Sequence, residues 1–181
     1  MKKKSNTVIS LQSLTLGAML TAVSIVVGIF CKNFLNFGNG LFRITFENFP
    51  IILSGLLFGP VVGAIVGAAS DMLSYILSTQ TFAISPIVTL GAASIGAVSG
   101  IVSRFFSKKN SATKVFVSAG TAHFVGSIVI KSFGLYAYYG SAVLVRIPLY
   151  FLITILESLI IIIMYRNRAF HRFLEQKETK K

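Results

Sequence analysis

The chain has 181 residues, of which 54% are hydrophobic and only 12% are charged, and its formal net charge is +12. Soluble domains carry about 25% charged residues, so we expect a single membrane domain over residues 1–181 without a soluble domain. In so apolar a chain the positive charge favours cytoplasmic loops that orient membrane spans, rather than a surface for nucleic acid.

Six apolar stretches follow one another, and a transmembrane helix needs about 20 residues. The first stretch, Leu11–Cys31, is too long for the core of a signal peptide, so we interpret it as a span. The stretch Ile44–Leu77 is interrupted at Gly59-Pro60, which predicts two short spans hinged there. The remaining spans are expected near Pro86–Phe106, Thr113–Phe133 and Ser141–Tyr165.

The basic residues favour an even number of spans. Thirteen of the 17 Lys and Arg fall in the N-terminus 1–10, in the loop 104–114 and in the tail 166–181. All three segments lie on one side only if an even number of spans separates them, and positive charge marks the cytoplasmic side. The sequence therefore predicts an all-α, six-transmembrane-helix bundle of the plasma membrane with both termini cytoplasmic.

The other four basic residues are Lys32, Arg43, Lys131 and Arg146, and they fall at or near the outer face. External loops usually avoid Lys and Arg, so this placement suggests a surface that receives an anion. Side chains that snorkel from helix ends explain Lys32 and Lys131 equally well.

Two charged residues inside the spans are candidates for ligand binding. Arg146 lies about one turn into the last span, and its planar guanidinium suits a carboxylate; a structural ion pair with Asp71 or Glu47 is the alternative. Asp71 lies near the middle of its span, where a carboxylate can accept the adjacent N–H groups of a pterin-like ring. Glu157 and His123 fall at similar depth, and we expect them to pair with each other.

Small residues recur at four-residue spacing in three spans. Such residues share a helix face and let helix backbones approach closely. Packing inside one bundle suffices to explain the repeats of the third and fourth spans. The repeats are Ala18 and Ala22; Gly59, Gly63 and Gly67; and Ala92, Gly96 and Gly100.

The outer face is rich in aromatic residues, among them Phe46, Tyr75 and Tyr139. Interfacial belts explain many of them, yet a glycine-bearing, aromatic and basic loop between Lys32 and Glu47 would also suit a flat anionic ligand. No phosphate-binding, metalloprotease or hydrolase motif is present, and the single cysteine excludes a multi-cysteine metal site. We therefore expect neither catalysis, nor ATP hydrolysis by the chain itself, nor a cofactor or metal.

The segment Leu41–Pro60, followed by Gly63, Gly67 and Asp71, and the later Arg146-Ile-Pro148 resemble the substrate-binding S components of energy-coupling factor (ECF) vitamin importers, in particular their folate-specific branch. The resemblance covers nearly the whole chain. It implies a bacterial six-helix bundle that captures folate from outside with high affinity. It also implies a complex with a membrane scaffold subunit and two cytoplasmic ATPases, and a docking face for the scaffold at Ala18 and Ala22.

Folate combines a flat pterin with a glutamate tail that bears two carboxylates. The resemblance therefore gives Arg43 or Arg146 the tail and Asp71 or Glu47 the pterin edge, without deciding which end lies deeper. Two alternatives stay open: an S component for another flat vitamin or nucleobase-like compound, or a small proton-coupled secondary transporter or membrane enzyme. The candidate substrate-binding residues are Arg146, Asp71, Arg43, Glu47, Phe46, Tyr75 and Tyr139.

Overall fold

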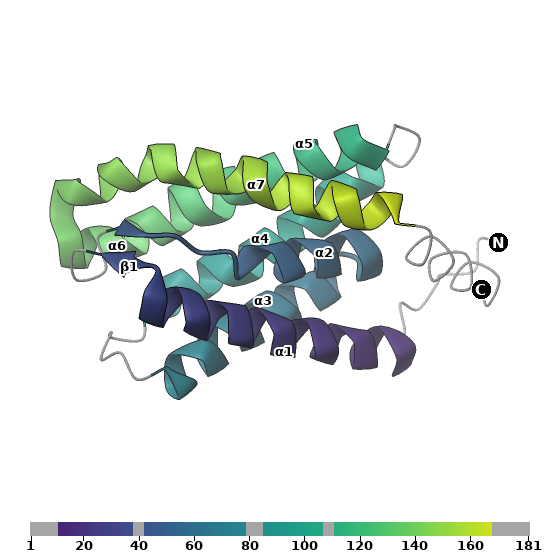
Figure 1. Cartoon of the computed structure of the whole chain (residues 1–181), viewed down its shortest axis with the longest axis horizontal. Helices are drawn as coiled ribbons and strands as arrows, with labels where there is room; N and C mark the ends of the chain where they lie inside the picture. Colours follow the sequence, from purple (N-terminus) through teal and green to yellow (C-terminus); the bar gives the residue numbers. More distant parts are fainter. Residues whose placement is uncertain (1–10, 38–41, 79–84, 107–110, 168–181) are drawn as a thin grey trace, which may run out of the picture.

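A computed structural model of the chain describes residues 11–37, 42–78, 85–106 and 111–167. The expected basic N-terminus and nearly all of the basic tail lie outside these residues. Helices lie side by side along the long axis of the molecule (Figure 1). In chain order the elements are α1 (Leu11–Phe34), β1 (Asn36–Phe37), β2 (Phe42–Arg43), α2 (Asn48–Phe58), α3 (Pro60–Leu77), α4 (Pro86–Phe105), α5 (Ser111–His123), the π-helix η1 (Phe124–Lys131), α6 (Ser132–Tyr139), the 3₁₀-helix η2 (Gly140–Val145) and α7 (Arg146–Arg166).

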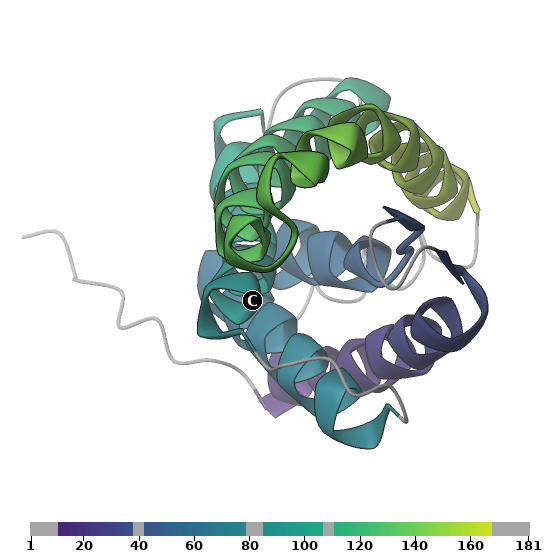
Figure 2. The same cartoon turned by 90° about the vertical axis from the view of Figure 1, so that its left-hand side faces the viewer.

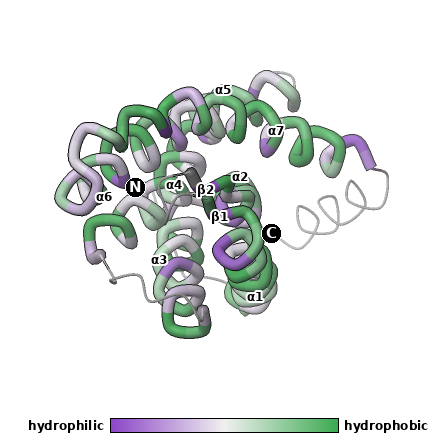
Figure 3. Tube along the Cα trace, turned by 60° about the vertical axis from the view of Figure 1, so that its left-hand side comes forward, coloured by the Kyte–Doolittle hydropathy of each residue, from purple (hydrophilic) through white to green (hydrophobic). Residues whose placement is uncertain are grey.

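The helical stretches are long and apolar enough for a membrane. Among the described residues, Leu11–Phe34, Pro60–Leu77, Pro86–Phe105 and the continuous run Ala112–Arg166 meet the length and hydropathy of a span. Hydrophobic residues follow the outer helices (Figure 3), and large apolar side chains such as Val26 and Ile163 are exposed. Apolar surface of this extent needs a bilayer to cover it. The expected all-α membrane fold is confirmed.

The short helix α2 lies in the interior. Eight of its 11 residues are buried, and it packs against α1, α3, α4 and α7. Seen from the end of the molecule at the left of Figure 1, α2 runs between α1 and the α5–α7 side (Figure 2). A helix of this length covers only ~16 Å at 1.5 Å per residue, about half of a bilayer core. Residues 44–46, which precede α2, are neither helix nor strand, and Thr45, Glu47 and Asn48 are buried inside the bundle.

Glycines bring α3 and α4 into close contact. A methyl group added at Gly96 would overlap the carbonyl of Gly63, and one added at Gly67 would overlap the carbonyl of Ala92. These two pairs show that the helices are antiparallel, with backbone against backbone. The expectation that these small residues pack inside the bundle is confirmed.

The predicted hinge at Gly59-Pro60 is also confirmed. Gly59 separates α2 from α3 with φ of 91°, a conformation that L side chains rarely adopt. Pro60 begins α3, where its missing N–H and fixed φ are tolerated. The chain can thus leave one helix and enter the next without a loop.

Several boundaries differ from those predicted. α1 continues to Phe34, beyond the expected end at Cys31, so that Lys32 belongs to the helix. The expected fifth span runs on through η1 to Tyr139, and Gly140, with φ of 56°, ends it. Arg146 is the first residue of α7 rather than one turn inside a span. A two-residue antiparallel pairing of β1 with β2, which the sequence did not predict, follows α1.

Candidate functional site

A pocket lies at the end of the bundle where β2, α6 and the beginning of α7 meet. The beginning of α1 and the end of α7 lie at the opposite end (Figure 1). The pocket contains side chains from nearly every helix because helix ends converge on it. Its lining consists of Arg43, Thr45, Glu47, Asn48, Tyr75, Ser85, Val88, Ser127, Lys131, Leu135, Tyr138, Tyr139, Arg146 and Tyr150.

Glu47 lies at the floor of this site. Its Oε1 accepts from Arg43 Nη2 at 3.1 Å, and its backbone carbonyl accepts from Ser24 Oγ on α1 at 2.7 Å. Burial opposes ionisation of Glu47, but Arg43, Lys131 and Lys32 outweigh burial and lower the pKa of its carboxyl below the usual range. Glu47 is therefore an anion at neutral pH, with the neighbouring cations arranged around it.

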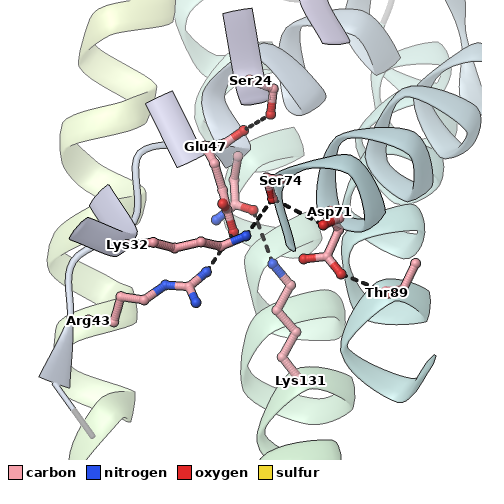
Figure 4. Close-up of polar contacts among 9 residues, drawn as sticks. Ser24, Lys32, Arg43, Glu47, Asp71, Ser74, Thr89 and Lys131 are labelled. Carbon is pink, nitrogen blue, oxygen red and sulfur yellow. Dashed lines mark hydrogen bonds and ion pairs between the residues drawn. The ribbon is translucent and has the colours of Figure 1, made fainter. Parts of the chain in front are cut away.

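Lys32 is fully buried although it carries a charge. Its Nζ donates to Ser74 Oγ at 2.5 Å and lies 3.9 Å from the centre of the Tyr75 ring, as a cation–π contact requires. Figure 4 shows the side chain reaching from α1 toward Ser74 on α3. Lys32 therefore belongs to the interior, and the alternative that it snorkels at a helix end is wrong.

Lys131 is the second buried lysine. It belongs to η1, is only 6% exposed, and its Nζ donates to Asn48 Oδ1 at 3.3 Å. Asn48 is the first residue of α2. The contact joins helices more than 80 residues apart in the sequence, and it brings a third cation to the side of Glu47 (Figure 4).

Asp71 lies behind this group rather than in the lining of the pocket. Its Oδ2 accepts from Thr89 Oγ1 at 2.8 Å, and its backbone carbonyl accepts from Ser74 Oγ at 3.0 Å. Its Oδ1 is buried and has no hydrogen-bond partner among the described residues. Asp71 is thus one side chain removed from the pocket, next to the residues that hold Lys32.

Arg146 lines the pocket from the first turn of α7. It is 8% exposed, and its guanidinium carbon lies 5.2 Å from the centre of the Tyr139 ring. Tyr139 ends α6 and belongs to the same lining. The planar guanidinium of an arginine can bind a carboxylate through two N–H groups.

The structure brings most of the predicted substrate-binding residues together. Arg43, Glu47, Tyr75, Tyr139 and Arg146 line one pocket, whereas Asp71 lies outside the lining. Phe46 is not among the lining residues. Lys32, Arg43 and Lys131 lie around Glu47, and Arg146 lines the same pocket. With Asp71 included, these four basic groups outnumber the acidic ones by two. Such an excess of partly or fully buried cations suits an anionic ligand.

Sequence reasoning missed several members of the site. Lys131 and Asn48 were not among the predicted binding residues, and neither was Ser127. The four basic residues near the outer face indicated a role for Lys131 in binding an anion, but a side chain that snorkels from a helix end explained its position equally well. Only the tertiary contact between η1 and α2 decides between these two explanations.

The expected pairing of His123 with Glu157 is confirmed. His123 Nε2 and Glu157 Oε2 are 2.6 Å apart, and both side chains are buried. The pair joins α5 to α7, whereas Asp71 bonds to Thr89 on α4. Among the described contacts, none links Asp71 to this pair, as a proton relay through all three residues would require.

Ala18 and Ala22 lie on the exposed face of α1. They border an apolar groove between α1 and α3, whose other members include Gly17, Val62 and Ile65. Gly17 contacts Val62 closely, which keeps the two helices together. The groove lies on the side of the bundle, apart from the polar pocket.

Comparison with known proteins gave four findings. Residues 12–170 match the family model of the ECF transporter substrate-specific component. The folate transporter FolT of Clostridium novyi (strain NT) is 31% identical over 122 residues, which are 67% of this chain and 69% of that protein. A structure of the S component of a bacterial ECF transporter superposes with a TM-score of 0.63 at 25% identity, over 90% of this chain and 97% of the other. A crystal structure of FolT bound with folic acid has the same fold, with a TM-score of 0.62 at 23% identity over 85% and 90% of the two chains.

Proposed function

Because the chain belongs to the substrate-specific components of ECF transporters, we propose that it captures folate for import. The observation that most supports folate as the ligand is the similarity to the folate transporter of Clostridium novyi. The family is that of a transporter subunit rather than an enzyme, so capture of the substrate is its task.

The pocket supports a ligand with the chemistry of folate. Two carboxylates of a glutamate tail would offset the excess of two basic groups, and Arg146 and Arg43 are the guanidinium groups that line the pocket. Tyr75, Tyr138, Tyr139 and Tyr150 supply aromatic faces for a flat pterin. Glu47 is the carboxylate of the lining that would accept the N–H groups of the pterin edge, whereas Asp71 lies behind the lining.

The arrangement in the membrane follows from the direction of the helices. We propose a single domain with six crossings, made by α1, α2, α3, α4, the run α5–α6, and α7. The beginning of α1 and the end of α7 share one end of the molecule (Figure 1), as an even number of crossings requires. The basic segments make this end cytoplasmic in a bacterial plasma membrane, and the pocket then faces outward.

Transport requires partners, because the chain carries no nucleotide-binding motif. We propose that the α1–α3 groove at Ala18 and Ala22 receives a helix of a membrane scaffold subunit, and that two cytoplasmic ATPases complete the complex. The groove is apolar and bordered by small residues, and helices pack closely at such surfaces within a bilayer.

The folate assignment is tested by the small molecule that accompanies the protein. The isolated chain is purified from cells in detergent and denatured, and the released compound is identified by mass spectrometry. Folate or a reduced folate is the expected result. Release of riboflavin, a deazapurine or another flat compound would agree with the family but would contradict folate as the ligand.

A further inference from the structure

Ser127 connects the pocket to the buried His123–Glu157 pair. It belongs to η1 and lines the pocket, and its Oγ is 3.1 Å from His123 Nδ1. The other ring nitrogen, Nε2, is 2.6 Å from Glu157 Oε2. One chain of hydrogen bonds therefore runs from the interior of α7 through α5 to the wall of the pocket. Neither the family nor the proposed function assigns a role to this chain.

The direction of these hydrogen bonds depends on how many protons the pair holds. If Glu157 is ionised and His123 neutral, Nε2 donates to the carboxylate and Nδ1 is an acceptor, so that the Ser127 hydroxyl must donate to it. If the pair holds one more proton, one hydrogen lies between Nε2 and Oε2 and Nδ1 carries the other. This holds both for an imidazolium with a carboxylate and for a neutral imidazole with a carboxylic acid, so in either case Nδ1 donates to Ser127.

The surroundings favour the pair with the additional proton. Glu157 and His123 are 0% and 1% exposed, and a net negative charge at such a position is costly. Lys131 on η1 and Glu47 before α2, which have opposite signs, also act on Glu157. Among the described residues, the side-chain hydrogen bonds of Lys131 and Glu47 go to Asn48 and Arg43 and not to this pair, so burial favours a pair without net charge.

The Ser127 hydroxyl is then able to donate into the pocket. Buried serines elsewhere, such as Ser54, Ser103 and Ser158, donate to a carbonyl three or four residues earlier in their own helix. Among the described residues, the Ser127 hydroxyl has only the contact with His123.

We propose that His123 and Glu157 are positioning residues that make Ser127 a hydrogen-bond donor to the anionic ligand of the pocket. This inference rests on the proposed function only for the identity of the ligand. The acceptor is a carboxylate or carbonyl oxygen, since an N–H group of the ligand would need an acceptor in its place.

The proton position is measured first, without ligand. Nitrogen-15 NMR of histidine-labelled protein in detergent near pH 7 distinguishes a protonated Nδ1 from an unprotonated one. The sequence has two histidines, His123 and His171, and the variant His123→Gln assigns the signals. A protonated Nδ1 of His123 is expected. An unprotonated Nδ1 would overturn the proposal, and this result does not depend on which ligand the protein binds.

The second measurement is the affinity for folate by calorimetry. Ser127→Ala is expected to weaken binding about tenfold to a hundredfold, as for the loss of a hydrogen bond to a charged group. The control Ser118→Ala, another buried serine of this helical run that lies outside the pocket lining, is expected to bind as the unchanged protein does. Equal affinity of Ser127→Ala and the unchanged protein would contradict the donor role.

A double-variant cycle separates positioning from a merely structural role. If His123 acts through Ser127, His123→Gln weakens binding in the original protein but adds little in Ser127→Ala. Additive losses would show that His123 acts by another route and would overturn the positioning role. Failure of the unchanged protein to bind folate would count against the proposed function alone, since the NMR result stands without it.

Discussion

At the scale of single residues, Arg146 decides how the pocket would hold a carboxylate. It is nearly buried, begins α7 and lies against Tyr139. A guanidinium in this position is fixed before the ligand arrives, so little freedom is lost when a bidentate contact forms.

We expect Arg146→Ala to weaken folate binding by roughly 1.5–3 kcal/mol, about tenfold to a hundredfold in affinity. Arg166→Ala is the matched control, because Arg166 ends the same helix, is exposed and lies at the far end of the bundle. Calorimetry on the two variants measures the difference. Equal affinities would remove Arg146 from the binding site.

Residue types and spacing predicted much of this pocket. Arg146 could be chosen because charged residues inside apolar spans are rare. Arg43 and Glu47 could be chosen as charges of the outer loop, and Tyr75 and Tyr139 as aromatic residues of the outer face. The burial of Lys32 and Lys131 could not, since it depends on which helix ends meet. Lys32 is interior because α1 extends past Cys31 and faces Ser74 of α3, a contact without a local signal.

At the scale of elements, the contact between α3 and α4 is the closest packing that the glycine repeats produce. The Gly96 backbone lies directly against that of Gly63, so no side chain fits between the helices. This contact fixes α3 against α4, and Thr89 of α4 donates to Asp71 of α3 farther along the same pair of helices.

We expect Gly96→Ala to destabilise the protein by about 1–3 kcal/mol or more, because the methyl group meets backbone atoms that cannot yield. Gly120→Ala is the control, since nothing lies within 4 Å of a Cβ at Gly120. In a helix this second change should be neutral or stabilising by up to about 1 kcal/mol. Thermal unfolding in detergent compares the two variants, and similar melting temperatures would show that the helices separate readily.

The elements themselves were largely predictable. The length of the apolar stretches predicted the helices. Gly59-Pro60 predicted the hinge, because the two residues together end one helix and begin another. The depth of α2 was not predictable, because its apolar sequence suits both a span and an interior helix. The boundaries at Phe34 and Gly140 were not predictable either, because they depend on turns that leave no signal in the hydropathy of the sequence.

At the scale of the whole molecule, the pocket and the α1–α3 groove lie apart, and we propose that they serve different parts of transport. The pocket is polar and lies at one end, whereas the groove is apolar and lies along the side. Capture of the ligand and docking with a partner can therefore be disturbed separately.

We expect Ala18→Trp combined with Ala22→Trp to leave folate binding by the isolated protein intact, because bulky rings fill the groove without reaching the pocket. Copurification with a scaffold subunit and cellular folate uptake should both fall. Met19→Trp combined with Val23→Trp is the control, since these exposed residues have the same spacing but do not line the groove. Loss of folate binding in the first variant would contradict the docking role.

The orientation in the membrane is tested by labelling single cysteines in a Cys31→Ser background. Ala112→Cys, at the beginning of α5, should resist an impermeant reagent added to intact cells. Tyr138→Cys, near the end of α6 and exposed, should react. Labelling of position 112 from outside would reverse the proposed topology.

The central claim is that this chain alone captures folate from outside the cell, with a basic pocket that needs no energy source. Isothermal titration of the purified protein with folate in the absence of ATP and of any partner subunit tests it most directly. Saturable binding at one site per chain is the result that we predict, with riboflavin and a deazapurine giving no heat of binding. Saturable binding of either control compound, with none of folate, would contradict the claim.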